Sequence, residues 1–294
     1  MKFLVFGSLN IDFLYTVNHI VKPGETISSL SFSKSAGGKG ANQAAALAKA
    51  GLTVYMAGKI GKDGRFLSER LSNFKVNTDN IIEYEGVTGH AIIQIDKNGQ
   101  NSIVLYPGGN GEITAEEIQK TISEFDKGDM IILQNEISNI DIIMSYAKNL
   151  GMKICLNPSP FNEKTAALPL ELTDIFFVNE IEGSSLARMS SSASPQDVLE
   201  KLIKIFPSAE IILTAGENGA YYGGGGIIEK EEIEKVPVVD TTAAGDTFTG
   251  YFLAARARNL SVKQSLAAAC KASSITVSKK GAMESIPFSD EVFN

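Results

Sequence analysis

Short apolar runs alternate along the chain with longer segments in which apolar residues recur at helical spacing. Runs of this length are typical of strands, and their alternation with helical segments is typical of a parallel sheet covered by helices. We therefore expect most of the chain to form one doubly wound α/β domain. The predicted strands are residues 3–6, 54–57, 130–133, 153–156, 175–178 and 211–213, and the predicted helices are residues 41–50, 66–74, 140–150 and 196–206.

Two stretches break this pattern, residues 11–34 and 86–106, because their residues alternate like those of exposed antiparallel strands. Asp-Lys-Asn-Gly at 96–99 has the composition of a hairpin turn. The two stretches are expected to pair into a small antiparallel β lid over the carboxyl edge of the main sheet, where open α/β folds bind ligands. The large domain would then comprise residues 1–10, 35–85 and 107–294. The exposed apolar face of the lid is the expected surface of a homodimer.

The charge and the cysteine content of the chain argue against several classes of function. The net charge of −7 argues against a general affinity for nucleic acid or for an anionic membrane, since both need clustered Lys and Arg. The two cysteines, Cys155 and Cys270, are too few for a disulfide framework. The apolar start of the chain is too short for a signal peptide, and no apolar run approaches membrane-spanning length. A cytoplasmic protein is expected.

The segment Asp240 to Gly250 is rich in small and hydroxyl residues and carries Asp246 at its centre. It lies between residues 236–239, a predicted strand, and a predicted helix that includes Phe248 and Phe252. Free N–H groups at a helix N-terminus form an anion site. A carboxylate beside such a site points to phosphoryl transfer, in which it would accept the proton of the attacking hydroxyl. A plain helix cap would explain the same residue types.

A second glycine-rich segment, Gly37-Gly38-Lys39-Gly40-Ala41-Asn42, opens a predicted helix. Glycines allow close approach of a ligand to the backbone, and Lys39 brings one positive charge into an acidic chain. The spacing of a P-loop is missing. Asn10 and Asp12 follow the first strand on one side of an extended segment and suit recognition of vicinal hydroxyls, although ordinary turns use the same residues.

The two glycine-containing segments together resemble the two signatures of the ribokinase-like family of sugar and nucleoside kinases. The similarity extends over nearly the whole chain, and two long motifs in the right order are highly specific. Further matching segments are Pro23 to Thr26, Leu156 to Pro160, Asn179 to Glu182 and Thr214 to Gly219.

The resemblance implies a role for each matching residue. Asp246 would be the base that takes the proton from the 5-hydroxyl of the sugar, with an anion hole formed by Ala243, Ala244 and Gly245. The sugar hydroxyls would be held by Asn10, Asp12, Gly38, Lys39, Asn42, Glu136 and Asp246. The nucleotide would be bound by Asn179, Thr214, Gly216 and Gly219.

The resemblance also implies two kinds of cation. Magnesium would accompany ATP, with Glu182 binding it through water. A monovalent cation, potassium in most family members, would lie beside the anion hole. The matching positions for potassium are Asp240, Thr242, Thr276, Lys279, Gly281 and Ser285, several of them through backbone carbonyls.

The expected activity is ATP-dependent phosphorylation of the 5-hydroxyl of D-ribose. A kinase of the same family acting on deoxyribose, fructose, 2-keto-3-deoxygluconate or a nucleoside such as adenosine is the nearest alternative. The polar set of predicted sugar contacts favours a sugar over a nucleoside. A non-catalytic sugar sensor and a purely structural dimerisation module are alternatives from other classes; the sensor is disfavoured because base and anion hole are both intact.

Overall fold

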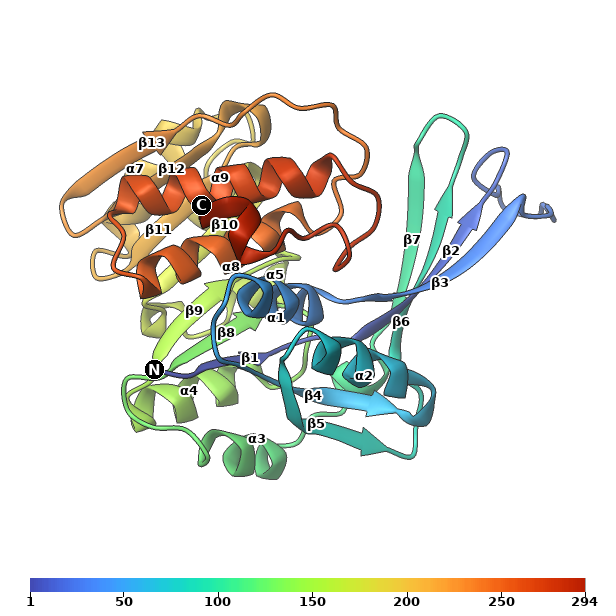
Figure 1. Cartoon of the computed structure of the whole chain (residues 1–294), viewed down its shortest axis with the longest axis horizontal. Coiled ribbons are helices and arrows are strands. Elements are labelled where there is room, and N and C mark those ends of the chain that lie inside the picture. Colours follow the sequence, from blue (N-terminus) through green and yellow to red (C-terminus); the bar gives the residue numbers. More distant parts are fainter. Residues whose placement is uncertain (294) are drawn as a thin grey trace.

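A nine-stranded sheet forms the centre of the computed structural model, which describes residues 1–293 (Figure 1). All neighbouring strands from β11 to β5 are parallel, and β12 and β13 add an antiparallel edge. In spatial order the strands are β13 (Ile227–Glu231), β12 (Ala220–Gly224), β11 (Glu210–Thr214), β10 (Ile175–Asn179), β9 (Lys153–Asn157), β8 (Met130–Gln134), β1 (Phe3–Phe6), β4 (Val54–Gly61) and β5 (Asn77–Tyr84).

Helices cover both faces of this sheet. One face packs against α1 (Lys39–Lys49), α2 (Arg65–Asn73), α8 (Ala244–Ala257), α9 (Val262–Val277) and α10 (Ser289–Phe293). The other face packs against α3 (Ala115–Ile122), α4 (Ile140–Leu150), α6 (Glu180–Ala187) and α7 (Pro195–Ile205). The short helix α5 (Glu163–Ala166) lies in the connection that follows β9.

Strand β1 is apolar throughout because both of its faces are buried. Phe3 and Val5 belong to the core beneath α1 and α8, whereas Leu4 and Phe6 belong to the core on the opposite face. A strand covered on both faces has no solvent side and therefore no polar alternation. Burying each such large apolar side chain contributes about 1.5–3 kcal/mol to the stability of the fold.

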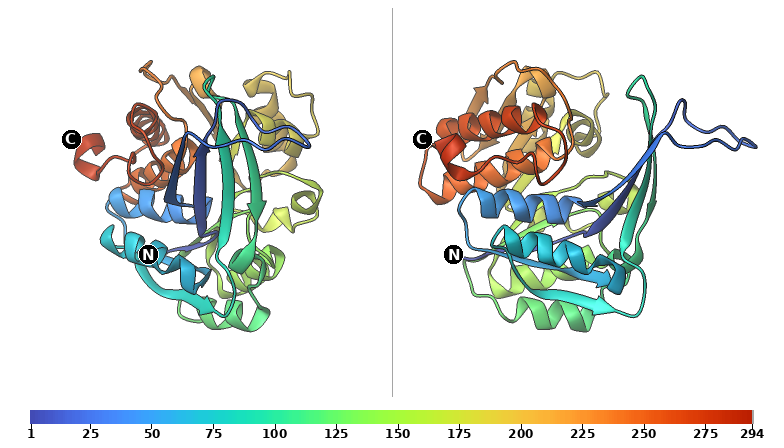
Figure 2. Two further views of the ribbon diagram at one scale, coloured as in Figure 1. Left: turned by 90° about the vertical axis from the view of Figure 1, so that its right-hand side faces the viewer. Right: turned by 45° about the vertical axis from the view of Figure 1, so that its right-hand side comes forward.

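A second sheet of four strands stands away from the main body, on the side where β1 and β4 end (Figures 1 and 2). Its strands, in spatial order, are β3 (Ser31–Gly37), β2 (Asn10–Thr16), β6 (Gly89–Ile95) and β7 (Asn101–Tyr106). β3 with β2 and β6 with β7 are antiparallel pairs, whereas β2 and β6 pair in parallel. We call this four-stranded sheet the lid.

The predicted strands and helices of the main domain are confirmed to within a few residues, and the predicted turn at 96–99 joins β6 to β7. The predicted strand at 236–239 is wrong, because β13 ends at Glu231 and the chain then has no regular structure before α8. Pro237 lacks the N–H that a ladder requires. Val239 and Asp240 both donate to the carbonyl of Val277 at the end of α9, at 2.8 and 3.2 Å, and not to a strand.

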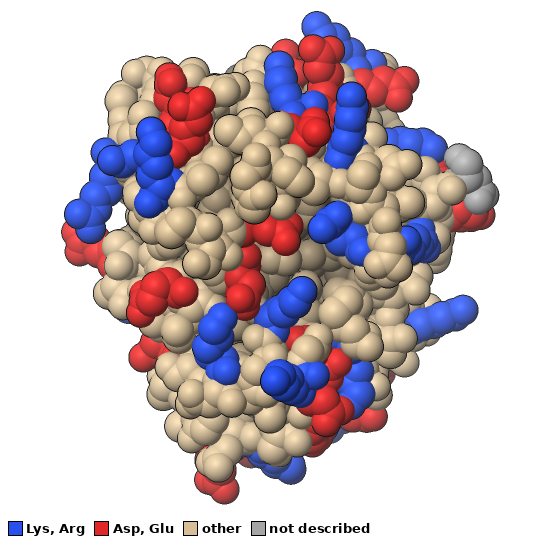
Figure 3. Space-filling model, turned by 90° about the vertical axis from the view of Figure 1, so that its left-hand side faces the viewer, with Lys and Arg blue, Asp and Glu red and all other residues tan. Residues whose placement is uncertain are grey.

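The surface turned away from the lid carries Lys and Arg interspersed with Asp and Glu (Figure 3). Alternating signs of this kind do not build an extended potential of one sign over that face. Among residues 1–293, every helix is too short or too polar to cross a lipid bilayer.

Candidate active site

The N-terminus of α8 is open to a cleft between the main sheet and the lid. Ala243, directly before the helix, has a left-handed φ of 62°, and no side chain among residues 1–293 caps the helix. Thr247 donates the first helical hydrogen bond, to the carbonyl of Ala243 at 2.8 Å, so the N–H groups of Gly245 and Asp246 have no carbonyl one turn earlier. A side-chain carbon at Gly245 would meet no atom of the described part of the chain within 4 Å. These N–H groups can therefore bind an anion.

Asp246 lies in the first turn of α8 and is buried. The side-chain amide of Gln43 donates to its Oδ1 at 2.9 Å, and that of Asn42 donates to its Oδ2 at 3.1 Å. Burial raises the pKa of Asp246, while the charge of Lys39 and the two amide hydrogen bonds oppose the rise. The carboxylate is oriented on both oxygens, and each oxygen keeps a lone pair for a ligand hydroxyl.

Glu136, in the loop after β8, holds the start of α1 in place. Its Oε2 accepts the hydroxyl of Ser8 and, at 3.1 Å, the N–H of Lys39. Gly38, which precedes the helix, has a φ of 95°, and a side chain there would lie 2.7 Å from the carbonyl oxygen of Ser8. Only glycine allows this close passage of the backbone. Burial raises the pKa of Glu136, against the charge of Lys39 and the hydrogen bonds from Ser8 and the Lys39 N–H.

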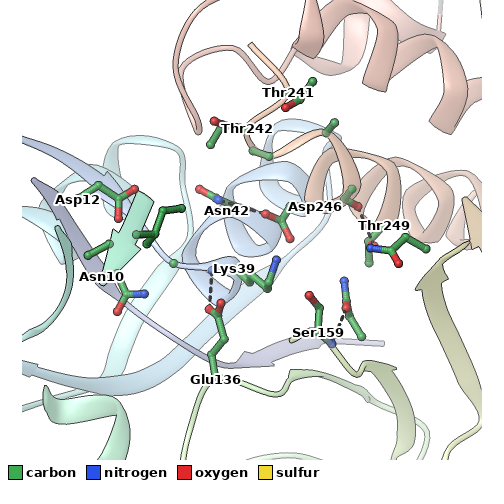
Figure 4. Close-up of a pocket in the computed structure, with 18 of the residues that line it drawn as sticks. Asn10, Asp12, Lys39, Asn42, Glu136, Ser159, Thr241, Thr242, Asp246 and Thr249 are labelled. Carbon is green, nitrogen blue, oxygen red and sulfur yellow. Dashed lines mark hydrogen bonds between the residues drawn. The ribbon is translucent and has the colours of Figure 1, made fainter. Parts of the chain in front are cut away.

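The ammonium group of Lys39 points toward Asp246 across the cleft (Figure 4). Within residues 1–293 it has no carboxylate partner within 4.0 Å. Its pKa lies above the ordinary value although burial lowers it, because the charges of Asp246, Glu136 and Glu182 outweigh the burial. The three carboxylates thus keep Lys39 charged, but none of them forms an ion pair with it.

The lid strand β2 brings Asn10 and Asp12 to the opposite side of the cleft (Figure 4). The amide of Asn110 donates to Asn10 Oδ1 at 2.8 Å, and Asn110 Oδ1 accepts the N–H of Leu9 at 3.0 Å. Asn10 is therefore held with its amide N–H groups free. Burial, reinforced by the negative charge of Glu136, raises the pKa of Asp12 to about 6.

The raised pKa of Asp12 gives a testable effect on stability. As pH rises from about 4, the unfolded chain releases the Asp12 proton before the folded chain does, so ionisation of this residue lowers the free energy of unfolding. The shift from 3.8 to about 6 corresponds to about 3 kcal/mol. Asp12→Asn should therefore gain stability relative to the wild type by up to about 3 kcal/mol between pH 4 and pH 7.

Urea unfolding of Asp12→Asn and wild type at one-unit pH intervals measures this difference. Asp126→Asn is a matched control, because the Asp126 side chain is 82% exposed. A stability difference for Asp12→Asn that stays constant across this pH range would contradict the assignment of a raised pKa.

All predicted sugar contacts line one cleft of about 510 Å³, together with Ala243, Ala244, Gly245, Asn179 and Glu182. A second pocket of about 740 Å³ adjoins it. The two share Thr214, Thr241, Ala244 and Gly245. The second pocket is mostly apolar and also contains the predicted nucleotide residues Gly216 and Gly219; its apolar lining is Ile233, Val236, Val238, Phe248, Cys270 and Val277. The first cleft, which we call the polar cleft because it holds the charged and polar groups beside aliphatic residues of the lid, thus meets the mostly apolar second pocket at the open N-terminus of α8.

Comparison with known proteins agrees with this arrangement. The family model of the pfkB family carbohydrate kinases matches residues 1–289. The chain belongs to the PfkB family of carbohydrate kinases. It is 35% identical to the ribokinase of Staphylococcus aureus, over 99% of this chain and 98% of that protein.

Solved structures of ribokinases have the same fold as this chain. The ribokinase of Cryptococcus neoformans in complex with ADP matches with a TM-score of 0.86 and 33% identity, over 99% of this chain and 98% of that one. The ribokinase of Arabidopsis thaliana complexed with ribose and ATP matches with a TM-score of 0.85 and 29% identity, over 99% and 97%. The doubly wound fold with its small second sheet is therefore confirmed, as is a kinase of sugar hydroxyls.

Asn179 and Glu182, at the boundary of β10 and α6, cap α6 reciprocally. The Asn179 side chain accepts the N–H of Glu182 at 2.9 Å, and Glu182 Oε2 accepts the N–H of Asn179 at 3.1 Å. This capping box would explain both residues without a ligand. Glu182 is nevertheless part of the cleft lining, and its other carboxylate oxygen is not needed for the cap.

Among the residues predicted for potassium binding, Asp240 contacts Thr242 and Gly281. Asp240 accepts the N–H and hydroxyl of Thr242 at 2.9 and 2.6 Å and the N–H of Gly281 at 3.0 Å. These bonds lower the pKa of Asp240 despite its partial burial. The other three side chains have different partners: Thr276 bonds to Thr247, Lys279 to Glu291 and Ser285 to the carbonyl of Ala282.

Several buried polar residues of the site do not stand out in the sequence. Gln43 contacts Asp246, and Gln134 donates to Gln43 at 2.7 Å. Asn110 holds Asn10, and Ser8 holds Glu136. The sequence does contain one signal: Gln43 lies one residue after the glycine-rich segment, and Gln134 ends an otherwise apolar buried strand. A polar residue at a fully buried strand end indicates a partner.

Proposed function

We propose that this chain transfers the γ-phosphate of Mg-ATP to the 5-hydroxyl of D-ribose, giving ribose 5-phosphate and ADP. The observation that carries the proposal is the position of Asp246 at the N-terminus of α8, where the polar cleft and the apolar pocket meet. The sugar would occupy the polar cleft and the nucleotide the apolar pocket. The ribokinases to which the chain is similar over its whole length support this substrate.

In this proposal each group of the site acts on one part of the reaction. The carboxylate of Asp246 accepts the proton of the 5-hydroxyl while that oxygen forms a bond to the γ-phosphorus. The bond between the γ-phosphorus and the bridging oxygen breaks, and ADP leaves with the electron pair. Negative charge on the transferred group faces the N–H groups of Gly245 and Asp246 and the ammonium of Lys39. Of the anion hole predicted from Ala243, Ala244 and Gly245, Ala244 donates its N–H to the carbonyl of Thr241 at 3.3 Å, and Asp246 supplies an N–H that was not predicted.

Two cations complete the proposal. The chemistry of Glu182 fits a magnesium ion that keeps most of its waters, because one carboxylate oxygen remains available in the cleft. Magnesium bound to ATP neutralises phosphate charge. Asp240 fits a potassium site, because its carboxylate is ionised and lies in the loop that leads to the anion hole. The predicted partners for potassium are Thr242, Thr276, Lys279, Gly281 and Ser285.

The lining of the polar cleft favours a sugar over a nucleoside. Asn10, Asp12, Lys39 and Glu136 present donors and acceptors, and the apolar residues of the lid that face the cleft are aliphatic: Leu14, Ala91, Ile93, Ile95, Ile103 and Leu105. A nucleobase would be expected to stack on an aromatic ring of the lid, whereas the aromatic residue of the cleft lining, Phe177, belongs to β10 of the main sheet. Adenine of ATP would instead lie against aliphatic side chains and Phe248 in the second pocket.

A coupled ADP-release assay tests the function. Mg-ATP is combined with ribose, deoxyribose, fructose, 2-keto-3-deoxygluconate, adenosine or uridine, each with potassium or with a bulky organic cation. Turnover on ribose that depends on potassium is the expected result. Turnover on another member of the panel would replace the substrate and keep the mechanism. No turnover on the panel, together with thermal stabilisation by ribose, would favour a sugar sensor.

We also propose that the lid, residues 11–34 and 86–106, closes the cleft and forms a homodimer. Its exposed apolar residues outside the cleft lining are Leu30, Phe32, Val87, Ile92, Val104 and Tyr106. Such a concentration of exposed apolar side chains is unusual for a monomer, and an isologous contact between two lids would bury it. Sedimentation velocity should give the mass of a dimer, and a monomer at assay concentrations would contradict this contact.

The cytoplasm is the proposed compartment. The reaction consumes ATP, and both cysteines, Cys155 and Cys270, are buried free thiols. Burial raises the pKa of Cys270 to about 12, so this thiol is not ionised at neutral pH and is poorly reactive.

A further inference from the structure

Two buried glutamines form a chain of hydrogen bonds that ends at Asp246. Gln134 Nε2, at the end of β8, donates to Gln43 Oε1 in α1 at 2.7 Å, and Gln43 Nε2 donates to Asp246 Oδ1 at 2.9 Å. Both glutamines are fully buried, with 0% exposure. The chain thus connects the centre of the main sheet to the candidate base through two side chains that do not reach the cleft themselves.

The carboxylate determines the direction of this chain. An ionised carboxylate only accepts hydrogen bonds, so Gln43 must turn its N–H toward Asp246 and its oxygen toward Gln134. Gln134 must then donate, which leaves its own Oε1 buried without a hydrogen-bond partner within residues 1–293. Gly7 provides the space, because a side chain at Gly7 would collide with this oxygen.

An unpaired buried oxygen destabilises a protein, and an apolar side chain of the same length at position 134 would avoid it. The hydrogen bond that Gln134 donates to Gln43 explains why position 134 carries an amide. We propose that Gln43 and Gln134 are positioning residues of the phosphoryl transfer, with Gln43 orienting the Asp246 carboxylate and favouring its ionised form, and Gln134 fixing the direction of Gln43. This inference rests on the proposed function.

Other charges near Asp246 set the background for any change in its protonation. Lys39 from α1 favours the ionised form, whereas Glu182 from α6 and Glu136 from the loop after β8 oppose it. Asn42 donates to Oδ2 independently of the two glutamines. Removal of the Gln43 donor changes none of these groups, so its effect on the pH profile can be read separately.

Gln43→Met and Gln134→Met test the proposal, because methionine keeps the length and much of the shape of glutamine but donates no hydrogen bond. In the ADP-release assay with saturating ribose and Mg-ATP, the acid limb of kcat should move upward by about one pH unit in Gln43→Met. The deficit in kcat should therefore shrink as pH rises. The KM for ribose should change little, since neither side chain reaches the cleft.

Gln196→Leu is the matched control for removal of an exposed amide donor, because Gln196 donates to the carboxylate of Glu200 at 3.1 Å on the surface of α7. Its pH profile should superimpose on that of the wild type. A rate deficit in Gln43→Met that is the same at every pH would overturn the proposal, since loss of packing alone has no reason to follow the ionisation of Asp246. An inactive wild type would instead contradict the proposed function.

The double variant Gln43→Met/Gln134→Met separates action through Gln43 from an independent structural role. If Gln134 acts only by directing Gln43, the double variant should have the pH profile of Gln43→Met, and the two effects should not add. Additive effects would overturn the role assigned to Gln134. Should Gln43→Met fail to fold, Gln134→Met alone remains decisive, because it must also shift the acid limb upward; an unshifted limb in the folded variant would contradict the chain.

Discussion

Asp246→Asn should reduce kcat by about 10²–10⁴-fold, because the variant cannot accept the proton of the attacking hydroxyl. Binding of the sugar should be largely retained, since Asn10, Asp12 and Lys39 remain in the same cleft. Turnover is measured by ADP release, and sugar binding by titration calorimetry. A near-normal kcat would show that Asp246 is not the base.

The free energy of unfolding of Asp246→Asn is expected to change only modestly compared with the loss of kcat. The introduced amide offers a single oxygen to the two donors, Asn42 and Gln43, so one buried donor loses its acceptor at a cost of about 1–3 kcal/mol. The substitution also removes a buried negative charge whose raised pKa indicates that ionisation destabilises the fold. The two effects oppose each other. Asp126→Asn, at an exposed carboxylate that pairs with Lys2 at 3.5 Å, should leave kcat unchanged and change stability by less than about 1 kcal/mol.

The position of Asp246 could be predicted because the local sequence determines it. Small residues followed by helical periodicity place an acidic residue in the first turn of a helix, and this relation does not depend on the rest of the fold. The same holds for Lys39 and Asn42 at the start of α1. For these residues the prediction of a shared site required only that both helices begin at the carboxyl edge of one parallel sheet.

The glutamine chain could not be predicted in the same way. Gln43 and Gln134 are separated by 91 residues and meet only because β8 lies beside β1 and beneath α1 in the folded sheet. Each residue alone matches an ordinary pattern, a polar position in a helix or at a strand end. The partner of a buried amide is a property of the tertiary structure, and a single sequence does not contain it.

Strand pairing is harder to predict from this sequence than strand location. Alternation in the lid segments predicts antiparallel pairing, and the parallel pairing of β2 with β6 follows from the long connection through the main domain. The apolar residues Val236, Val238 and Val239 have strand composition, but Val238 is 64% exposed and lines the second pocket. Their apolar character thus fits a ligand surface as well as it fits a strand.

Lys39→Met should reduce kcat by about 10²–10³-fold, the effect of removing one group that stabilises charge in a transition state. Lys39 lies among Asp246, Glu136 and Glu182 and lowers the pKa of the first two. The pKa of Asp246 should therefore rise in the variant, and the acid limb of kcat should move to higher pH. The pH profile of ADP release measures both effects.

The plateau at high pH distinguishes Lys39 from the glutamines. Raising the pH restores the ionised form of Asp246, so the kcat of Gln43→Met should recover. A higher pH cannot restore a cation beside the transferred phosphate, so the kcat of Lys39→Met should stay low. Lys39→Arg keeps the charge and should retain more activity than Lys39→Met, while Lys204→Met, at an exposed position of α7, should behave as the wild type. A plateau for Lys39→Met close to that of the wild type would mean that the N–H groups of α8 alone stabilise the charge of the transferred group.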